Sequence, residues 1–326
     1  MRTVLTVENL KVEYSTKRGK VKAVRDVSVE LFEGETLAVM GESGSGKTTF
    51  ALAILKLLPL SGKISSGRIL YRKNGNEYDV SSMSEKEIKE KIRWKEIAMV
   101  FQAAQNSFNP LMKIWDHIKD TVKDHNIRMD KNTLLSKSEE LLKLLQLEPK
   151  RVLNAYPHEL SGGMKQRTLI ALSLILDPSI LILDEPTTAL DILTQRNILE
   201  LLKNIKKKMN LSMILISHDL AIAAELADRV ATFYAGVLIE IGSVFDVFYN
   251  PKHPYTKGLI NSVPTVSRDK QLYSIPGSPP DLVFLPSGCK FHPRCEYKVD
   301  RCEKEEPRLE YVESDHYVAC WRWREL

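Results

Sequence analysis

A glycine-rich turn between a short apolar strand and a helix constrains the fold of this chain more than any other feature. The turn runs Gly-Glu-Ser-Gly-Ser-Gly-Lys-Thr from Gly41 to Thr48 and matches the pattern GxxxxGK[ST]. Residues 36–40 are predicted as the strand before it, and residues 50–58 as the helix after it, ending before Pro59. Such a turn wraps phosphate groups with backbone N–H groups, and the helix adds the positive end of its dipole. An α/β fold of the P-loop NTPase type is therefore expected.

The residue types in the turn suit a nucleotide. Lys47 can reach the β- and γ-phosphates, and the Thr48 hydroxyl can ligate Mg²⁺. The predicted nucleotide-binding residues are Gly41, Glu42, Ser43, Gly44, Ser45, Gly46, Lys47, Thr48 and Thr49. The alternative is a chance glycine turn, which the surrounding strand and helix disfavour.

A second apolar strand ends in two adjacent carboxylates. Residues 180–183 read Ile-Leu-Ile-Leu and lead into Asp184 and Glu185, at the strand end where ligands bind in open α/β sheets. Asp184 is expected to hold Mg²⁺, directly or through water, and Glu185 to orient or deprotonate the attacking water. An apolar strand that ends in Asp-Glu usually has only a structural role when no other motif accompanies it. Behind a P-loop it predicts the second half of a nucleotide site.

Composition and charge narrow the class of protein. The 326 residues carry 47 basic and 42 acidic side chains, for a net charge of +5, so the charge gives no strong case for a nucleic-acid partner. No window reaches the roughly 18–20 apolar residues that a membrane span needs, and residues 1–10 lack the pattern of a secretion signal. The chain is expected to be cytoplasmic, with any membrane role exerted through partners.

The order of predicted elements indicates an α/β core with a helical insertion. Half-buried strands are expected at residues 10–14 and 27–31, joined by a polar hairpin loop over residues 15–20. Further strands are expected at residues 97–101, 180–183, 213–216, 229–234 and 237–241, with a helix at residues 194–209. Helices should dominate residues 84–176, where Ser84 and Glu87 form a capping box. Prolines become frequent after residue 250, which divides the chain into domains 1–250 and 251–326.

A motif at residues 160–167 identifies the type of P-loop protein. It reads Leu-Ser-Gly-Gly-Met-Lys-Gln-Arg and resembles the signature sequence of ABC (ATP-binding cassette) ATPases. Ser161, Gly162 and Gly163 open a helix, which is another terminus that can receive an anion; an ordinary capped helix start would leave the Gln-Arg pair unexplained. The resemblance implies a RecA-like core, an antiparallel β subdomain and a helical subdomain. It also implies that two cassettes pair head to tail, with each ATP between one P-loop and the other cassette's signature.

Other residues follow the order of motifs in this family. Tyr14 is similar to the aromatic residue that stacks on adenine, although an ordinary strand tyrosine would look the same. Gln102 resembles the glutamine that reaches Mg²⁺ and water, and His218 the histidine that contacts the γ-phosphate. Residues 189–191, Ala-Leu-Asp, resemble the loop that communicates across the dimer. Because Glu185 and His218 are both present, the resemblance implies a site able to hydrolyse ATP.

Two segments resemble parts that couple such ATPases to a transporter. Residues 106–110, Asn-Ser-Phe-Asn-Pro, resemble the segment that docks a short helix of the transmembrane subunits; a simple turn is the alternative. Residues 251–264 resemble the extension of oligopeptide/dipeptide-type ABC ATPases, a subfamily that includes importers of peptides, nickel and, in some organisms, oligosaccharides. The resemblance implies two permeases, an extracytoplasmic binding protein, a second cassette that is a paralogue, and a peripheral place on the cytoplasmic membrane face.

All four cysteines lie near the carboxyl end, spaced C-x5-C-x6-C-x17-C. They are Cys289, Cys295, Cys302 and Cys320. Four thiolates can bind Zn²⁺ or a [4Fe–4S] cluster, and the long gaps disfavour a zinc knuckle. Some members of the subfamily carry [4Fe–4S] on similar cysteines, so a cluster is expected, with Zn²⁺ or free cysteines as alternatives and His292 as a further candidate ligand.

Two other functions are alternatives to a transport ATPase. A soluble ABC ATPase acting on ribosomes or DNA would carry two cassettes or a long coiled-coil insertion, and this chain has neither. A small-molecule kinase would not carry the motif at residues 160–167. The sequence does not identify the cargo, because specificity resides in the partner subunits.

Overall fold

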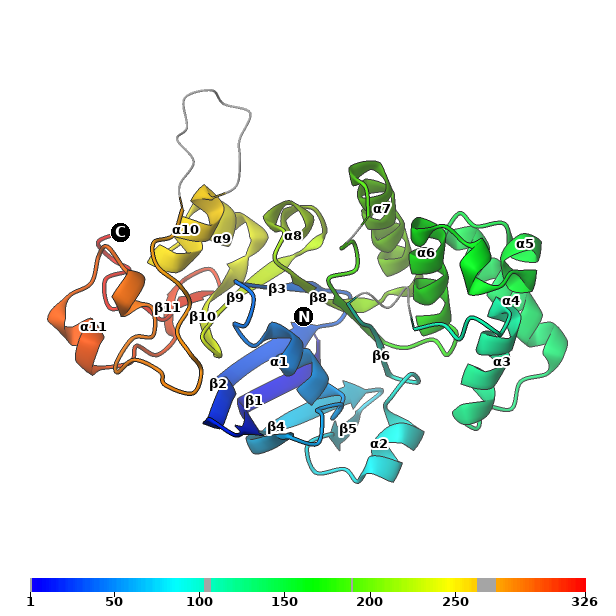
Figure 1. Ribbon diagram of the computed structural model, residues 1–326, viewed down its shortest axis with the longest axis horizontal. Helices are drawn as coiled ribbons and strands as arrows, with labels where there is room; N and C mark the ends of the chain where they lie inside the picture. The colour runs from blue at the N-terminus through cyan, green and yellow to red at the C-terminus, as the bar shows by residue number, and fades with distance from the viewer. Residues whose placement is uncertain (1, 103–106, 189, 263–273) are drawn as a thin grey trace. The chain divides into compact units, whose positions relative to one another are not determined.

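The computed structural model describes residues 2–102, 107–188, 190–262 and 274–326, and the chain divides into two compact units. Unit 1 contains Met1–Ser82 and Leu215–Leu326, and unit 2 contains Met83–Ile214. Unit 1 is therefore built from both ends of the chain, which are the blue and the yellow-to-red parts of Figure 1.

Unit 1 contains an antiparallel four-stranded sheet, hydrogen-bonded in the order β2-β1-β4-β5. Its strands are β1 (Thr3–Thr16), β2 (Gly19–Phe32), β4 (Gly62–Lys73) and β5 (Asn76–Asp79). Leu10 and Val12 of β1 are fully buried. The predicted strands are confirmed, but the predicted hairpin loop is wrong in length, because β1 and β2 pair as far as Thr16 and Gly19.

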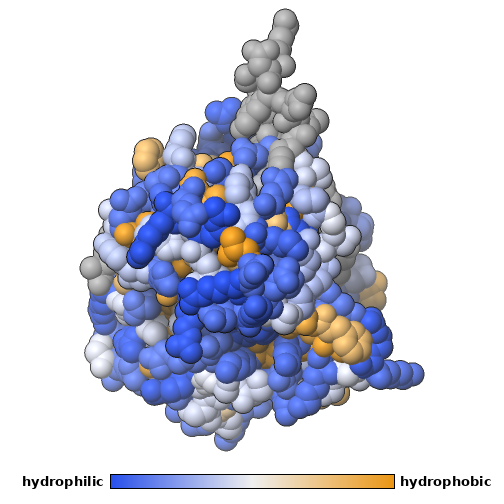
Figure 2. Space-filling model, turned by 90° about the vertical axis from the view of Figure 1, so that its left-hand side faces the viewer, coloured by the Kyte–Doolittle hydropathy of each residue, from blue (hydrophilic) through white to orange (hydrophobic). Residues whose placement is uncertain are grey.

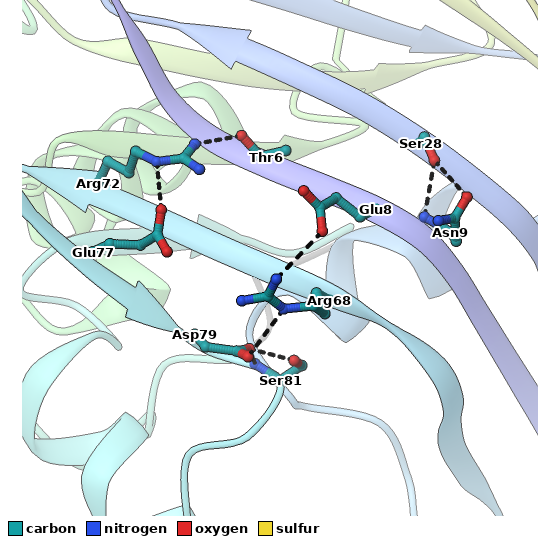
Figure 3. Close-up of polar contacts among 9 residues, drawn as sticks. All are labelled: Thr6, Glu8, Asn9, Ser28, Arg68, Arg72, Glu77, Asp79 and Ser81. Carbon is teal, nitrogen blue, oxygen red and sulfur yellow. Dashed lines mark hydrogen bonds and ion pairs between the residues drawn. The ribbon is translucent and has the colours of Figure 1, made fainter.

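Polar side chains link the strands of this sheet (Figure 3). Arg72 of β4 donates to Thr6 of β1 at 2.6 Å and to Glu77 of β5 at 2.7 Å. Arg68, also on β4, lies 3.5 Å from Asp79 of β5. Opposite charges on neighbouring strands favour this register over its alternatives.

Unit 1 also contributes strands to a second sheet, in the order β11-β12-β10-β9-β3. These strands are β3 (Thr36–Met40), β9 (Arg229–Tyr234), β10 (Val237–Ser243), β11 (Glu310–Glu313) and β12 (His316–Val318). β3 and β9 run parallel, as expected for an α/β core, and every residue of β3 is buried, which explains its continuous apolar sequence. Helices α8 (Leu220–Leu226) and α9 (Val244–Tyr249) cover β3 and β9 through an apolar cluster.

The helix after the glycine-rich turn is α1 (Lys47–Ile54). The helix predicted over residues 50–58 is therefore wrong at both ends. Gly46, at φ 104°, lies immediately before the first turn, so Lys47 and Thr48 already belong to the helix. Lys56 adopts a left-handed conformation at φ 49°, which stops the helix before Pro59 is reached.

Residues 274–326, called the C-terminal lobe below, have little regular structure. In unit 1, α10 (Pro254–Asn261) precedes this lobe in the sequence, and the lobe contains the one-turn helix His292–Arg294, α11 (Asp300–Lys304), β11 and β12. Phe291 of the lobe packs with Tyr234, Ile239 and Tyr255 in a buried cluster. The face of the molecule on the side of α11 is mostly hydrophilic, with apolar residues in small separate groups (Figure 2).

Unit 2 is mainly helical. Its helices are α2 (Glu85–Lys91), α3 (Ile114–Asp124), α4 (Lys131–Leu144), α5 (Pro149–Asn154), the one-turn helix Pro157–Glu159, α6 (Gly162–Ser173) and α7 (Ile192–Met209). Strands β6 (Ile97–Val100) and β7 (Ile180–Asp184) pair in parallel, and β8 (Ser212–Ser217) begins in unit 2 and ends in unit 1. The capping box of Ser84 and Glu87 is confirmed at the start of α2. Among the described helices, none has both the length and the apolar character of a membrane span.

Candidate nucleotide-binding site

The backbone of the glycine-rich turn can be formed only by glycine at two positions. Gly41 has φ 145°, and a Cβ there would lie 2.2 Å from the carbonyl oxygen of Phe233. Gly46 has φ 104°, and its Cβ would lie 2.2 Å from the carbonyl oxygen of Ala23. L-residues rarely adopt these angles, and both neighbours are backbone atoms that cannot move aside. The turn is therefore held between β9 and β2 in a fixed, open shape.

The side chains of the turn place a cation beside exposed hydroxyls. The Nζ of Lys47 donates to the carbonyl oxygens of Gly41 at 2.7 Å and Glu42 at 2.9 Å. Ser43 and Thr48 are exposed, whereas Lys47 is only 6% exposed. A buried ammonium under exposed N–H and O–H donors is suited to a phosphate chain.

Tyr14 lies beside the start of α1. Its hydroxyl is 3.1 Å from Oγ1 of Thr49, and a Cβ on Gly62 would meet its ring at 2.5 Å. The half-buried ring is therefore fixed next to the phosphate-binding turn, in a place consistent with stacking on a base.

His218 follows β8 in unit 1 and is exposed. The turn that carries it is fixed by the Ser217 hydroxyl, which accepts from the Asp219 N–H at 2.9 Å. Asp219 in turn caps α8 by accepting from the Ala221 N–H at 2.8 Å. Hydrogen bonds of both neighbours of His218 therefore fix the turn that carries it.

Unit 2 brings Gln102 and Glu185 together, although 83 residues separate them in the sequence. The Gln102 side-chain amide donates to Oε2 of Glu185 at 2.9 Å, and the Thr188 hydroxyl donates to the same oxygen at 3.0 Å. Glu185 has φ 48°, an unusual left-handed backbone for a residue of this size. Asp184, the last residue of β7, is 1% exposed. The carboxylate of Glu185 is thus oriented by two hydrogen-bond donors.

The motif at residues 160–167 also lies in unit 2. The Ser161 hydroxyl caps α6 by accepting from the Met164 N–H at 3.3 Å, and Ser161 and Gly162 are exposed. A cavity of about 310 Å³ is lined by this motif and by the start of α7, where Asp191 accepts from the Thr194 N–H at 2.9 Å. That cap, led by the Thr194 side chain, lowers the pKa of Asp191. The motif therefore presents a capped helix terminus at an open surface.

The predicted ATP residues fall into two groups, one in each unit. Tyr14, the glycine-rich turn and His218 belong to unit 1, whereas Gln102, Ser161, Asp184 and Glu185 belong to unit 2. Parts of three predicted segments lie outside the described residues, namely Asn106, Ala189 and residues 263–264.

All four cysteines are free thiols that line one small cavity in the C-terminal lobe. Burial raises the pKa of Cys289 to about 11 and that of Cys320 to about 12, and neighbouring thiols add to both shifts. Within residues 2–102, 107–188, 190–262 and 274–326, no group of three or more His, Cys, Asp or Glu residues could hold a metal ion. The predicted metal site is therefore not confirmed. His292 bonds the carbonyl oxygen of Cys289 through Nδ1, at 2.8 Å.

Two residues at the nucleotide-binding turn escaped sequence reasoning. Arg294 of the C-terminal lobe forms an ion pair with Glu42, and the Tyr255 hydroxyl accepts from the Glu42 N–H. They lie 252 and 213 residues from Glu42, and no local pattern marks a contact at that separation.

Family models match segments in both the amino-terminal and the carboxyl-terminal half of the sequence. A family model for "ABC transporter" matches residues 24–188, and one for "Oligopeptide/dipeptide transporter, C-terminal region" matches residues 239–302. A dipeptide transport ATP-binding protein of Caldanaerobacter subterraneus is 49% identical over 326 residues, which is 100% of this chain and 98% of the relative. An oligopeptide transport ATP-binding protein of Bacillus subtilis is 43% identical over 322 residues, covering 98% and 88% of the two chains.

Solved structures agree with these matches. A dimeric bacterial ABC transporter cassette is 28% identical, with a TM-score of 0.63, over 74% of this chain and 98% of that one. A cassette dimer in a post-hydrolysis state with ADP and Pi is 27% identical, with a TM-score of 0.63 and the same coverage.

Proposed function

The chain belongs to the ATP-binding proteins of ABC transporters, and on this premise we propose that it hydrolyses ATP to energise the import of peptides. The observation that carries the proposal is the similarity to dipeptide and oligopeptide transport proteins, which extends from the glycine-rich turn through the C-terminal lobe. These relatives are named for peptides, so we favour peptides over oligosaccharides as cargo. A role on ribosomes or DNA, and a nucleic-acid partner, are not favoured.

In the proposed reaction, ATP binds at the turn of unit 1. Lys47 and the backbone N–H groups of residues 41–49 hold the phosphates, and Tyr14 stacks on adenine. Glu185 orients or deprotonates the attacking water, since Gln102 and Thr188 direct its carboxylate. His218 contacts the γ-phosphate.

The predicted ligands supply oxygen donors of the types that magnesium prefers. Thr48 is exposed at the turn, and Asp184 and Gln102 end or follow buried strands. Mg²⁺ would neutralise charge that develops on the phosphates. Thr48, Asp184 and Gln102 are proposed as its ligands.

A second cassette completes the site in this proposal. The exposed terminus formed by Ser161, Gly162 and Gly163 would receive the γ-phosphate of ATP bound to the partner cassette. We propose that the partner is a paralogue and that two permeases and an extracytoplasmic binding protein complete the importer. The chain would then lie at the cytoplasmic face of the membrane, with residues 106–110 docking a permease. We propose two domains, residues 1–250 and residues 251–326. The first would include a helical subdomain at about residues 84–176.

We further propose that the four cysteines hold a [4Fe–4S] cluster. Their thiols converge on one cavity, and the raised pKa values of Cys289 and Cys320 indicate that thiolates there need a compensating positive centre. A cluster spreads its ligands over several iron atoms, whereas zinc requires ligands about 2.3 Å from one ion. Anaerobic purification should give iron, sulfide and absorbance near 400 nm, and bound zinc without iron would overturn this assignment.

Transport in reconstituted vesicles tests the main proposal. The chain is combined with its paralogue, the permeases and the binding protein, and uptake of labelled peptide is followed with ATP inside or outside. Uptake that requires ATP on the side of this chain, and that disappears with Lys47→Ala, is expected. Hydrolysis stimulated by nucleic acid, without peptide uptake, would refute the proposal.

A further inference from the structure

Arg294 of the C-terminal lobe forms a bidentate ion pair with Glu42 of the nucleotide-binding turn. Its Nη1 lies 2.7 Å from Oε2 of Glu42, and its Nη2 lies 3.0 Å from Oε1. Its Nε donates to the carbonyl oxygen of Pro276 at 2.7 Å. The Arg294 side chain is 5% exposed and that of Glu42 is 26% exposed. A two-pronged, largely buried pair of this kind fixes orientation as well as distance.

The backbone of Glu42 is held from the same side. Its N–H donates to the Tyr255 hydroxyl at 2.7 Å, and Tyr255 is fully buried. The Tyr255 ring packs against Tyr234 and Phe291, with ring centres 4.6 Å and 5.4 Å away. Burial raises the pKa of Tyr255, so its hydroxyl stays protonated. Both the side chain and the backbone of Glu42 are therefore anchored to rigid groups outside the turn.

Glu42 also connects directly to the phosphate-binding lysine. The carbonyl oxygen of Glu42 accepts from Nζ of Lys47 at 2.9 Å and from the Ser45 N–H at 3.2 Å. A small cavity between the turn and the lobe is lined by residues 42–45 and by Pro279, Pro280 and Leu282. A shift of Glu42 would therefore displace a partner of Lys47 and alter the N–H groups that follow.

We propose that Arg294 is a positioning residue for nucleotide binding: by holding Glu42, it keeps the glycine-rich turn in the shape that receives phosphates. The proposal rests on the proposed function, namely that this turn binds ATP. Preorganisation of this kind raises affinity because the loop does not lose conformational freedom on binding. It also gives the C-terminal lobe a part in nucleotide binding, although the lobe contributes none of the predicted ATP residues.

Equilibrium binding of MgADP to the full chain tests the proposal, because ADP probes the turn without hydrolysis. The variants are Arg294→Gln, Arg294→Lys, Glu42→Ala and the double variant Arg294→Gln/Glu42→Ala. Arg301→Gln is the matched control, since Arg301 lies in the same lobe but pairs with Glu305 on the exposed face. We expect Arg294→Gln to weaken binding about 5- to 30-fold, Arg294→Lys to recover part of the loss through its retained charge, and Arg301→Gln to bind like wild type.

The double variant separates positioning from a general effect on the lobe. If Arg294 acts through Glu42, then Arg294→Gln should change affinity less than about twofold when Glu42 is already alanine. Wild-type affinity in Arg294→Gln, or an equal loss with and without Glu42, would overturn the inference. If Arg294→Gln fails to fold, Glu42→Gln replaces it, and unchanged affinity in that variant overturns the inference. Failure of the wild-type chain to bind MgADP would instead refute the proposed function.

Discussion

Glu240 should be the residue whose loss most damages the attachment of the C-terminal segments to β10. It is fully buried, and its carboxylate accepts three hydrogen bonds. The Nε2 of His316 lies 2.8 Å from Oε1, the Lys252 N–H donates to Oε1 at 2.6 Å, and the His253 N–H donates to Oε2 at 3.0 Å. One side chain thus joins β10 to β12 and to the segment before α10.

The cost of Glu240→Ala follows from the groups left behind. Two backbone N–H groups and a ring nitrogen lose their acceptor in the interior, and each unsatisfied buried group costs about 1–3 kcal/mol. For these three groups together we expect a loss of about 4 kcal/mol in the free energy of unfolding. Glu240→Gln keeps one acceptor oxygen but turns an amide N–H₂ toward a donor, so a smaller loss of about 1–3 kcal/mol is expected.

Urea unfolding, followed by tryptophan fluorescence, measures both losses. Replacing Trp94 and Trp115 by phenylalanine leaves Trp321 and Trp323 of the C-terminal lobe as reporters. Glu313→Ala is the control, because Glu313 is exposed on β11 and should leave the unfolding midpoint unchanged. A loss below about 1 kcal/mol in Glu240→Ala, or equal losses in the alanine and glutamine variants, would show that these hydrogen bonds do not hold the segments together.

Three further predictions concern catalysis, the turn and pH. Glu185→Gln should slow phosphate release about 10²- to 10⁴-fold while MgATP affinity stays within a few-fold of wild type; hydrolysis within tenfold of wild type would contradict its role. Gly41→Ala should abolish MgADP binding in a titration, because its Cβ would lie 2.2 Å from the Phe233 carbonyl oxygen. Gly44→Ala should weaken binding less, because it adds backbone strain at φ 78° but its Cβ meets no atom within 4 Å. Burial lowers the pKa of His253 to about 3, so below about pH 6.5 the unfolded chain binds a proton that the folded chain does not. The free energy of unfolding should therefore fall by about 2 kcal/mol from pH 6.5 to pH 5. In urea titrations at both pH values, His253→Asn should remove this loss.

The sequence predicted the parts of the fold whose signal is local. The apolar run at residues 36–40 and the capping box at Ser84 became β3 and the start of α2, because burial and capping depend on neighbouring residues. The predicted P-loop fold is confirmed by the similarity to solved ABC cassettes. The ends of α1 were misplaced, since positive φ angles at Gly46 and Lys56, rather than the distant Pro59, set its limits.

Contacts between remote segments could not be predicted. Sequence motifs marked Gln102 and Glu185 separately, but their hydrogen bond depends on the parallel pairing of β6 and β7. Arg294 lies in the cysteine-rich segment, and no sequence motif there connects an arginine with Glu42. Its role depends on packing of the C-terminal lobe, which carries no periodic pattern.

Unit 1 is formed by segments from both ends of the chain, and this has a consequence for biosynthesis. The Thr36 N–H, at the start of β3, bonds to Asp228, which lies 192 residues further along the chain. At roughly 5–20 residues per second, a ribosome needs about 10–40 seconds to make that interval. During this time the emerging chain carries an apolar strand without its neighbour. A nascent chain should therefore depend on chaperones early and acquire nucleotide affinity only late in translation.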